Sequence, residues 1–248
     1  MLRGLYTAAS ALRADQTWQE VVANNLDNLA TPGYKADQAV VGEFGTALLS
    51  RLGGGSQAIG TLGAGSGVVE TVANLASGGL QQTGRGLDVA PVGGAWLAVR
   101  TAQGNRYTQD GALALSASGE LVTASGQAVL GSGGGPIVVP AGLAVQIAPD
   151  GTVSAGGRAV GRLLLTTFSR PALLQEQGGG LFLAPAAAGA RAYAPGSGVE
   201  AGYLESSNVN ESTVTVQLIQ VQGDFQANQT ALVSADQTFN QLIQDLGK

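Results

Sequence analysis

Apolar side chains at both ends of the chain recur in alternating steps of three and four residues. Near the C-terminus the series comprises Val214, Leu218, Val221, Phe225, Asn228, Leu232, Ala235, Phe239, Leu242 and Leu246. Near the N-terminus it comprises Leu5, Ala8, Leu12, Val22, Leu26 and Leu29, with polar interruptions at Asp15 and Gln19. This spacing places one stripe of side chains along one face of a helix, as in a coiled coil. We call the two series the heptad seams, and they predict two long terminal helices.

Turn and capping residues set the expected limits of these helices. The first helix is expected from about Leu5 to Ala30, because Pro32 disfavours helical geometry at Thr31 and Gly33 permits a turn. The second is expected to begin after Asn208, whose spacing from Glu211 matches a capping box, and to run to about Leu246.

The middle of the chain has a different pattern. From Val68 to Leu204, short alternating apolar runs are separated by turn residues, including Asp110-Gly111 and Asp150-Gly151. Asp-Gly between such runs predicts hairpins, because both residues tolerate positive φ. Before this region, residues 36–52 are compatible with a short helix or an extended arm, and the glycine-rich residues 53–67 predict an irregular loop.

The sequence therefore predicts an α+β protein. Its long N- and C-terminal helices pair as a coiled-coil assembly domain, formed by residues 1–35 and 206–248. Residues 36–84 form a glycine-rich linker or arm, and residues 85–205 form a central antiparallel β-rich domain.

Composition excludes several classes of function. Charged residues make up only 12% of the 248 residues, about half the usual share, which favours a surface covered by neighbouring molecules or by small polar side chains. The net charge is −5 and basic clusters are absent, so nucleic-acid binding is not expected. The chain has no histidine and no cysteine, so we expect no metal site and no cofactor.

Catalytic chemistry has little support. A phosphate-binding loop needs a lysine after its glycines, and the only lysines are Lys35 and Lys248. Asp88, Asp110 and Asp150 are the only candidates for a pair of catalytic carboxylates, but two of them directly precede glycine, which is typical of turns. The N-terminus does not resemble a secretory signal peptide, and no stretch approaches the ~20 apolar residues of a membrane span.

The second predicted helix has unusually few charges outside its seam. Between Ser212 and Leu246 the only charged residues are Asp224, Asp236 and Asp245, and glutamine dominates the remaining polar positions. Neutral amides can be buried without the cost of desolvating ions, so this surface favours packing against other subunits. The alternative is an intramolecular two-helix stalk without further partners. Asn228 lies in the seam, where a polar residue costs some stability but can fix the register of paired helices. Gly223 would cost about 1 kcal/mol relative to alanine, and the sequence fits either close approach of a neighbouring backbone or a neutral change at this position.

Several motifs resemble one protein family. Residues 24–35, Asn-Asn-Leu-Asp-Asn-Leu-Ala-Thr-Pro-Gly-Tyr-Lys, resemble the N-terminal signature of the flagellar rod and hook family. Leu87-Asp88-Val89-Ala90, Tyr107-Thr108-Gln109-Asp110-Gly111 and residues 202–209 are similar to its later motifs, in the same order along the chain.

The resemblance implies a structural subunit of the bacterial flagellar basal-body rod, of the FlgF/FlgG type, without enzymatic activity. Such a motility protein is expected to pass unfolded through the flagellar type III export apparatus, without a cleaved signal. It would polymerise helically outside the cytoplasm with copies of itself and other rod and hook subunits, and its terminal helices would order on assembly. The proximal rod is slightly favoured over the distal rod. The alternatives are a hook-type subunit or a secreted β-rich carbohydrate-binding module.

These expectations define a predicted assembly interface. The first helix and the motif after it contribute Leu5, Leu12, Val22, Asn24, Asn25, Leu26, Asn28, Leu29, Pro32 and Gly33. The second helix contributes Val214, Leu218, Val221, Phe225, Asn228, Leu232, Phe239, Leu242 and Leu246.

Overall fold

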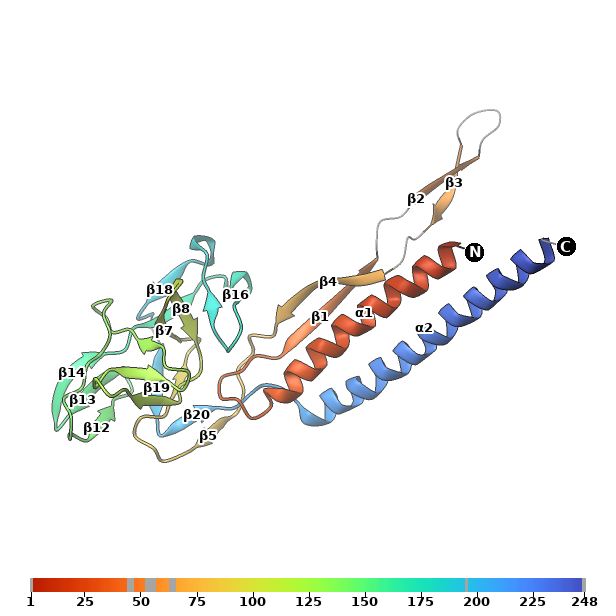
Figure 1. The fold of residues 1–248 in the computed structure, drawn as a ribbon. Helices are drawn as coiled ribbons and strands as arrows, with labels where there is room; N and C mark the ends of the chain where they lie inside the picture. Colours follow the sequence, from red (N-terminus) through yellow and green to blue (C-terminus); the bar gives the residue numbers. More distant parts are fainter. Residues whose placement is uncertain (1, 44–46, 52–56, 63–65, 195, 247–248) are drawn as a thin grey trace. The chain divides into compact units, whose positions relative to one another are not determined.

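The computed structural model describes residues 2–43, 47–51, 57–62, 66–194 and 196–246, and the chain divides into two compact units (Figure 1). The helical unit contains Met1–Asp27, Asp37–Asn74 and Asn210–Lys248. The β unit contains Asn28–Ala36 and Leu75–Val209. The terminal helices and the central antiparallel strands together confirm the predicted α+β class.

The helical unit contains both terminal helices. α1 spans Leu2–Asp27, 26 residues, and α2 spans Glu211–Leu246, 36 residues. They lie side by side and run in opposite directions (Figure 1). α1 ends before the predicted Ala30 because the Asn28 carbonyl accepts from Thr31 N and the Asn28 side chain accepts from Thr31 Oγ1. Asparagine side chains that bond locally in this way compete with helical hydrogen bonds.

The capping box predicted at Asn208 is wrong. α2 begins at Glu211, and its cap is Asn210, whose Oδ1 accepts from Thr213 N at 3.0 Å. This satisfies one of the free N–H groups of the first turn. The Asn208 side chain has other partners, because its Oδ1 accepts from Ala36 N at 2.7 Å and its Nδ2 donates to Ala76 O at 2.8 Å.

The part of the helical unit that directly follows residue 36 is extended where it is described. It forms four strands, which are β1 (Asp37–Glu43), β2 (Ala47–Arg51), β3 (Gln57–Leu62) and β4 (Ser66–Ala73). β1 pairs with β4, from Asp37 opposite Ala73, and β2 pairs with β3. The extended alternative therefore applies to the described part of residues 36–52. The irregular loop predicted for residues 53–67 is wrong where β3 and the start of β4 lie, and residues 53–56 and 63–65 are outside the described residues.

The β unit is built almost entirely from short antiparallel strands. Its elements are β5 (Leu80–Gln82), β6 (Val89–Val92), β7 (Trp96–Thr101), β8 (Gly104–Thr108), β9 (Leu113–Leu115), β10 (Leu121–Thr123), β11 (Ala128–Val129), β12 (Val145–Ile147), β13 (Thr152–Ala155), β14 (Arg158–Arg162), β15 (Leu165–Phe168), β16 (Gln175–Glu176), β17 (Phe182–Leu183), β18 (Ala190–Ala192), β19 (Gly198–Ala201) and β20 (Tyr203–Glu205), with short 3-10 helices at Pro171–Leu173 and Ala186–Ala188. The main sheet runs β16-β17-β8-β7-β11-β10-β9, and β15 joins β7 to β18. Three smaller sheets pair β12-β13-β14, β19-β6 and β20-β5.

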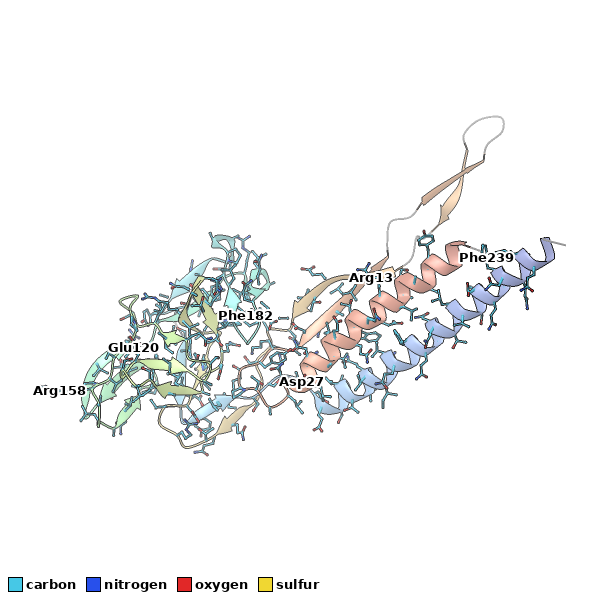
Figure 2. The ribbon with its side chains drawn as sticks, viewed as in Figure 1. Arg13, Asp27, Glu120, Arg158, Phe182 and Phe239 are labelled. Atoms are coloured by element: carbon cyan, nitrogen blue, oxygen red, sulfur yellow. The ribbon has the colours of Figure 1, made fainter. Side chains whose placement is uncertain are left out.

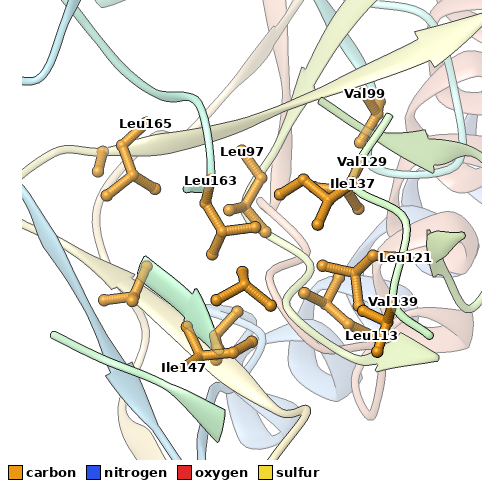
Figure 3. Packing of buried hydrophobic residues seen from close by; sticks show 14 of the residues in the cluster. Leu97, Val99, Leu113, Leu121, Val129, Ile137, Val139, Ile147, Leu163 and Leu165 are labelled. Atoms are coloured by element: carbon orange, nitrogen blue, oxygen red, sulfur yellow. The ribbon is translucent and has the colours of Figure 1, made fainter. Parts of the chain in front are cut away.

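The β unit has one hydrophobic core, which is shown in Figure 3. Leu97, Leu113, Leu121 and Leu163 are among its members, and each is at most 1% exposed. On the adjoining face Trp96 makes edge contacts with Phe182, with ring centroids 5.0 Å apart, and with Phe168 at 6.2 Å. Along β13 polar and apolar residues alternate, so every second side chain points into the unit. β10 shows the same alternation of burial, although its second buried residue is the polar Thr123.

The two predicted Asp-Gly hairpins have different outcomes. Asp150-Gly151 joins β12 to β13, which pair directly, and Gly151 has φ +85°. Asp110-Gly111 joins β8 to β9, which pair with other strands, so that hairpin is wrong. Gly111 is instead pressed against the strand at β6, because Val89 N donates to Gly111 O and a Cβ on Gly111 would collide with the Val89 carbonyl. In a sequence, a glycine that is needed because another backbone passes close to it looks the same as a glycine that is needed for a turn.

Candidate assembly surface

The facing sides of α1 and α2 contain the most buried residues of the two seams. Val22 on α1 and Val221 on α2 are each 1% exposed, and Val214 is also buried. Asn228 Nδ2 donates to Asp15 Oδ2 at 2.8 Å, so the polar residues of the two seams bond to each other. The bond connects residues 213 positions apart in the chain, one on each helix.

Burial of the predicted interface decreases along α2. Leu218, Phe225 and Leu232 are half-buried, as is Leu12 on α1. Phe239 and Leu242 are exposed, and so is Leu26 near the end of α1. The side chains of Leu5 and Leu246 lie outside the described part. The seams therefore contain apolar surface that the single chain covers at one end of α2 and leaves open toward the other.

A second apolar feature of α2 was missed in the sequence. Val216, Ile219, Val233 and Ile243 lie outside the seam and are between 50% and 67% exposed. The first three fall on the side of α2 opposite the seam, around Gly223, where a Cβ would meet nothing within 4 Å. The spacing of Val216, Ile219 and Gly223 places them on one face of the helix. Because that face also contains many glutamines, it was interpreted as a polar surface. Exposed apolar positions on both sides of one helix are typical of surfaces that other molecules cover.

The predicted interface residues near the end of α1 are divided between the two units. Asn25 is buried in the helical unit, where its Nδ2 donates to Asp37 O and its Oδ1 accepts from Asp37 N, both at 2.8 Å. Asn24 lies beside it, with Nδ2 3.4 Å from Asp37 Oδ2. These bonds attach the first residue of β1 to the last turns of α1. The amides thus position the strand pair β1-β4 rather than extend the helix seam.

The remaining predicted residues lie in the β unit. Asn28, Leu29 and Pro32 are half-buried there, and Gly33 is buried. Gly33 has φ +67°, and its N–H donates to Glu205 O at 2.7 Å. A side chain on Gly33 would collide with the backbone of Gln109 and Asp110. The predicted turn glycine is therefore also required for close packing.

Next to Gly33 is a buried ion pair that sequence reasoning did not identify. Lys35 Nζ donates to Glu205 Oε1 at 2.7 Å, and the two side chains are 1% and 2% exposed. Lys35 also donates to Ala76 O at 3.1 Å, and Gly78 N donates to Glu205 Oε1 at 2.7 Å. We call Lys35, Glu205 and Asn208, with the backbone they bind, the buried clasp. It joins three passages of the chain, 33–36, 76–78 and 205–208. In the sequence, Lys35 and Glu205 were noted only as members of the family motifs, and their pairing was not predicted.

The three candidate carboxylates lie in different environments. Asp150 is exposed on the β12-β13 turn, and hydrogen bonds from Thr152 hold its pKa below the ordinary value. Asp110 has a raised pKa, mainly because burial disfavours its charge, and the Asp88 carboxylate adds to the shift. Asp88 is buried, and Arg85 approaches its Oδ1 only to 3.6 Å. In the described residues, no three metal-ligating side chains gather.

Comparison with known proteins supplies the family. A model of flagella basal body rod proteins matches residues 5–35, a flagellar hook protein FlgE/F/G D1 domain model matches 92–155, and a flagellar basal body rod FlgEFG C-terminal model matches 200–245. The chain is 32% identical to the flagellar basal-body rod protein FlgG of Bacillus subtilis, with 98% of each chain covered. It belongs to the flagellar basal-body rod family, of the FlgF/FlgG type.

Other relatives in the family are equally similar over the whole chain. The flagellar basal-body rod protein FlgF of Salmonella typhimurium is 33% identical, covering 98% of this chain and 99% of its own length. The flagellar hook-basal body complex protein FlhO of Bacillus subtilis is 29% identical over the full length of both. Family members are structural rod proteins rather than enzymes, in agreement with the prediction. Within the described residues, neither helix has the length and apolar character needed to cross a membrane.

Proposed function

We propose that this chain is a structural subunit of the bacterial flagellar rod and polymerises through α1 and α2. The observation that carries the proposal is the incomplete covering of α2, which exposes seam residues Phe239 and Leu242 together with Val216 and Ile219 on its other side. Covering such apolar area stabilises an assembly by about 25 cal/mol per Å² removed from water. Membership of the rod family supplies the neighbours that would cover it.

In this proposal α1 and α2 pair as an antiparallel coiled coil and form the inner wall of a helical tube. The tube acts as a drive shaft, because a densely packed wall resists twisting. The β unit is a module joined to the helices. The contacts between copies are made by predicted interface residues that the single chain leaves exposed, such as Leu26 on α1 and Phe239 and Leu242 on α2. Copies of this chain and other rod and hook subunits are the partners. The terminal helices become fully ordered only in the polymer, whose contacts offset the ordering cost.

We also infer how the subunit reaches its place in the basal body. It passes unfolded through the flagellar type III export apparatus, without a cleaved signal peptide, and assembles outside the cytoplasm in the basal body. Identities to FlgF and FlgG relatives, 33% and 32%, do not separate positions along the rod. We assign the proximal rod over the distal rod, and locating a tagged chain in isolated basal bodies tests that choice.

Truncation tests the role of α2. A chain that ends at Asn208 should fail to enter basal bodies but keep the folded β unit, which the emission of the buried Trp96 reports when Trp18 is replaced by Phe. A matched control ending at Leu246 keeps every predicted interface residue and should still assemble. Incorporation of the truncated chain at the wild-type level would refute assembly through the helices. Glycan binding by the truncated chain would favour the carbohydrate-binding alternative instead.

A further inference from the structure

A pocket between α1 and α2 has the chemistry of a cation site. Its volume is about 280 Å³, and it lies wholly in the helical unit. Asp15, Asp224 and Asn228 contribute its polar atoms, Trp18 contributes an aromatic wall, and alanines from both helices make the rest. A space of this size admits a long side chain, since one water occupies ≈ 30 Å³ in the liquid.

Asp15 adds a second, independent observation. Its side chain is only 8% exposed, and its Oδ2 accepts a neutral amide hydrogen bond from Asn228. Among the described residues it has no ion pair. α2 contains no lysine or arginine between Glu211 and Leu246, so it supplies no compensating charge. A buried carboxylate without a cation is costly, which points to a positive group from outside the chain.

We propose that this pocket receives the guanidinium of Arg13 from a second copy of the chain, an inference that rests on the proposed polymer. Arg13 is exposed and forms no ion pair among the described residues. The sequence of α1 has one other cation, Arg3, in its first turn. A guanidinium can bond both carboxylates and lie against the Trp18 indole. Only two carboxylates line the pocket, and no group of three metal-ligating side chains gathers in the described residues.

The placement of Arg13 determines the type of contact. At 100° per residue it lies roughly 150° around α1 from Asp15 and Trp18, on the side away from the pocket (Figure 2). Arg13, which donates, and Asp15, which accepts, are thus on opposite faces of α1. A contact of this kind joins copies head to tail, and repeated without closure it generates an open helical filament rather than a closed dimer. The inferred pair is therefore compatible with a rod.

Cross-linking in assembled rods tests the pair directly, because the chain has no cysteine. Two full-length chains, Arg13→Cys and Asp224→Cys, are co-expressed in a flagellated strain that lacks its own copy, and isolated basal bodies are treated with a short bis-maleimide. A bis-maleimide is preferable to a disulfide, whose Cα atoms must lie within ~7 Å. We expect peptides linking positions 13 and 224 of different copies. Glu20→Cys with Asp224→Cys is the matched control, since Glu20 is exposed two turns further along the Arg13 side of α1.

Charge reversal gives an independent result. Arg13→Asp and Asp224→Arg alone should each lower the chain's content in basal bodies at least about tenfold, and the double variant should restore most of it. The inference is overturned if 13–224 links do not exceed the Glu20 control in rods that contain the chain, or if the double variant assembles no better than the single ones. If the unaltered chain never enters basal bodies, the proposed function fails instead.

Discussion

Two charged residues with almost no exposure form a buried ion pair in the β unit. Lys35 and Glu205 are far apart in the sequence, yet their side chains are 2.7 Å apart and each also binds backbone. A buried pair adds little net stability compared with a hydrophobic replacement, but the loss of one partner leaves an uncompensated charge. The clasp therefore acts mainly by allowing only one arrangement of the three passages that it joins.

Substitution of the clasp should separate these two effects. Lys35→Met leaves Glu205 buried and unpaired, so we expect it to lower the free energy of unfolding of the β unit by about 3–5 kcal/mol. Urea titration followed by Trp96 emission, in chains in which Trp18 is replaced by Phe, measures this loss. The matched double variant, Lys35→Met with Glu205→Leu, should recover most of it because no buried charge remains. A single variant within about 1 kcal/mol of the unaltered chain would show that the pair is not buried in solution.

Asp110 and Asp150 predict opposite dependences on pH. Burial raises the pKa of Asp110, so its folded form binds a proton more readily than the unfolded chain, and its charge destabilises the fold above that pKa. Asp110→Asn should therefore raise the melting temperature at pH 7, and the gain should disappear as pH falls below the ordinary value of 3.8. Asp150, with a lowered pKa, stabilises the fold above 3.8 and loses this contribution in acid.

Asp150→Asn is thus the matched control, with a small loss near neutrality that fades in acid. Melting curves of the three proteins between pH 2 and 8 measure both effects. The two variants must change stability in opposite directions at pH 7. A destabilising Asp110→Asn at that pH would contradict the assigned cause, namely the desolvation of its carboxylate.

Among the elements, the terminal helices were predictable and the central strand pairing was not. The seams gave α1 and α2 because Val214, Val221 and their neighbours repeat with helical spacing over many turns. The exact cap was ambiguous, since Asn208 and Asn210 both precede the helix and only the structure shows that Asn208 binds Ala36. Residues 57–62 lacked a strand signal because glycines flank them, and pairing with β2 overrides local preference.

Substitution of Gly223 distinguishes an effect on the stability of α2 from an effect on assembly. A Cβ at this position would meet nothing within 4 Å in the single chain, so Gly223→Ala should stabilise α2 by about 1 kcal/mol. If a neighbouring backbone packs against this face in the rod, the same change should reduce incorporation into basal bodies. We expect both results, measured by helical circular dichroism of the purified chain and by quantitative immunoblotting of basal bodies.

Gln220→Ala is the control for Gly223→Ala, because it alters another exposed position on α2. It should change neither incorporation nor helicity by a comparable amount. Full incorporation of Gly223→Ala would mean that no backbone approaches this face closely, and the glycine would then have no assembly role.

For the whole molecule, the family motifs predicted more than the residue patterns did. The seams predict paired helices but are equally compatible with an isolated stalk, whereas motifs near Asn24, Asp88 and Tyr203 occur in family order and lead to the rod. Contacts between copies involve residues whose partners are outside the chain. We propose such contacts at exposed residues such as Ile219 and Phe239, whereas the buried core of the β unit forms within the single chain.

The chain has two tryptophans, one in each unit, so variants that retain only one of them follow the two units separately. Trp18 lies on α1 beside the interhelical pocket, and Trp96 is 3% exposed in the β unit. If the helices order fully only among copies, Trp96→Phe, which retains Trp18, should emit at long wavelength when dilute and shift to shorter wavelength as the chain polymerises. Trp18→Phe, which retains Trp96, should emit at short wavelength at every concentration. Short-wavelength emission from Trp18 in dilute monomer, unchanged on polymerisation, would show that α1 and α2 pack fully before assembly and that the rod gains no stability from ordering them.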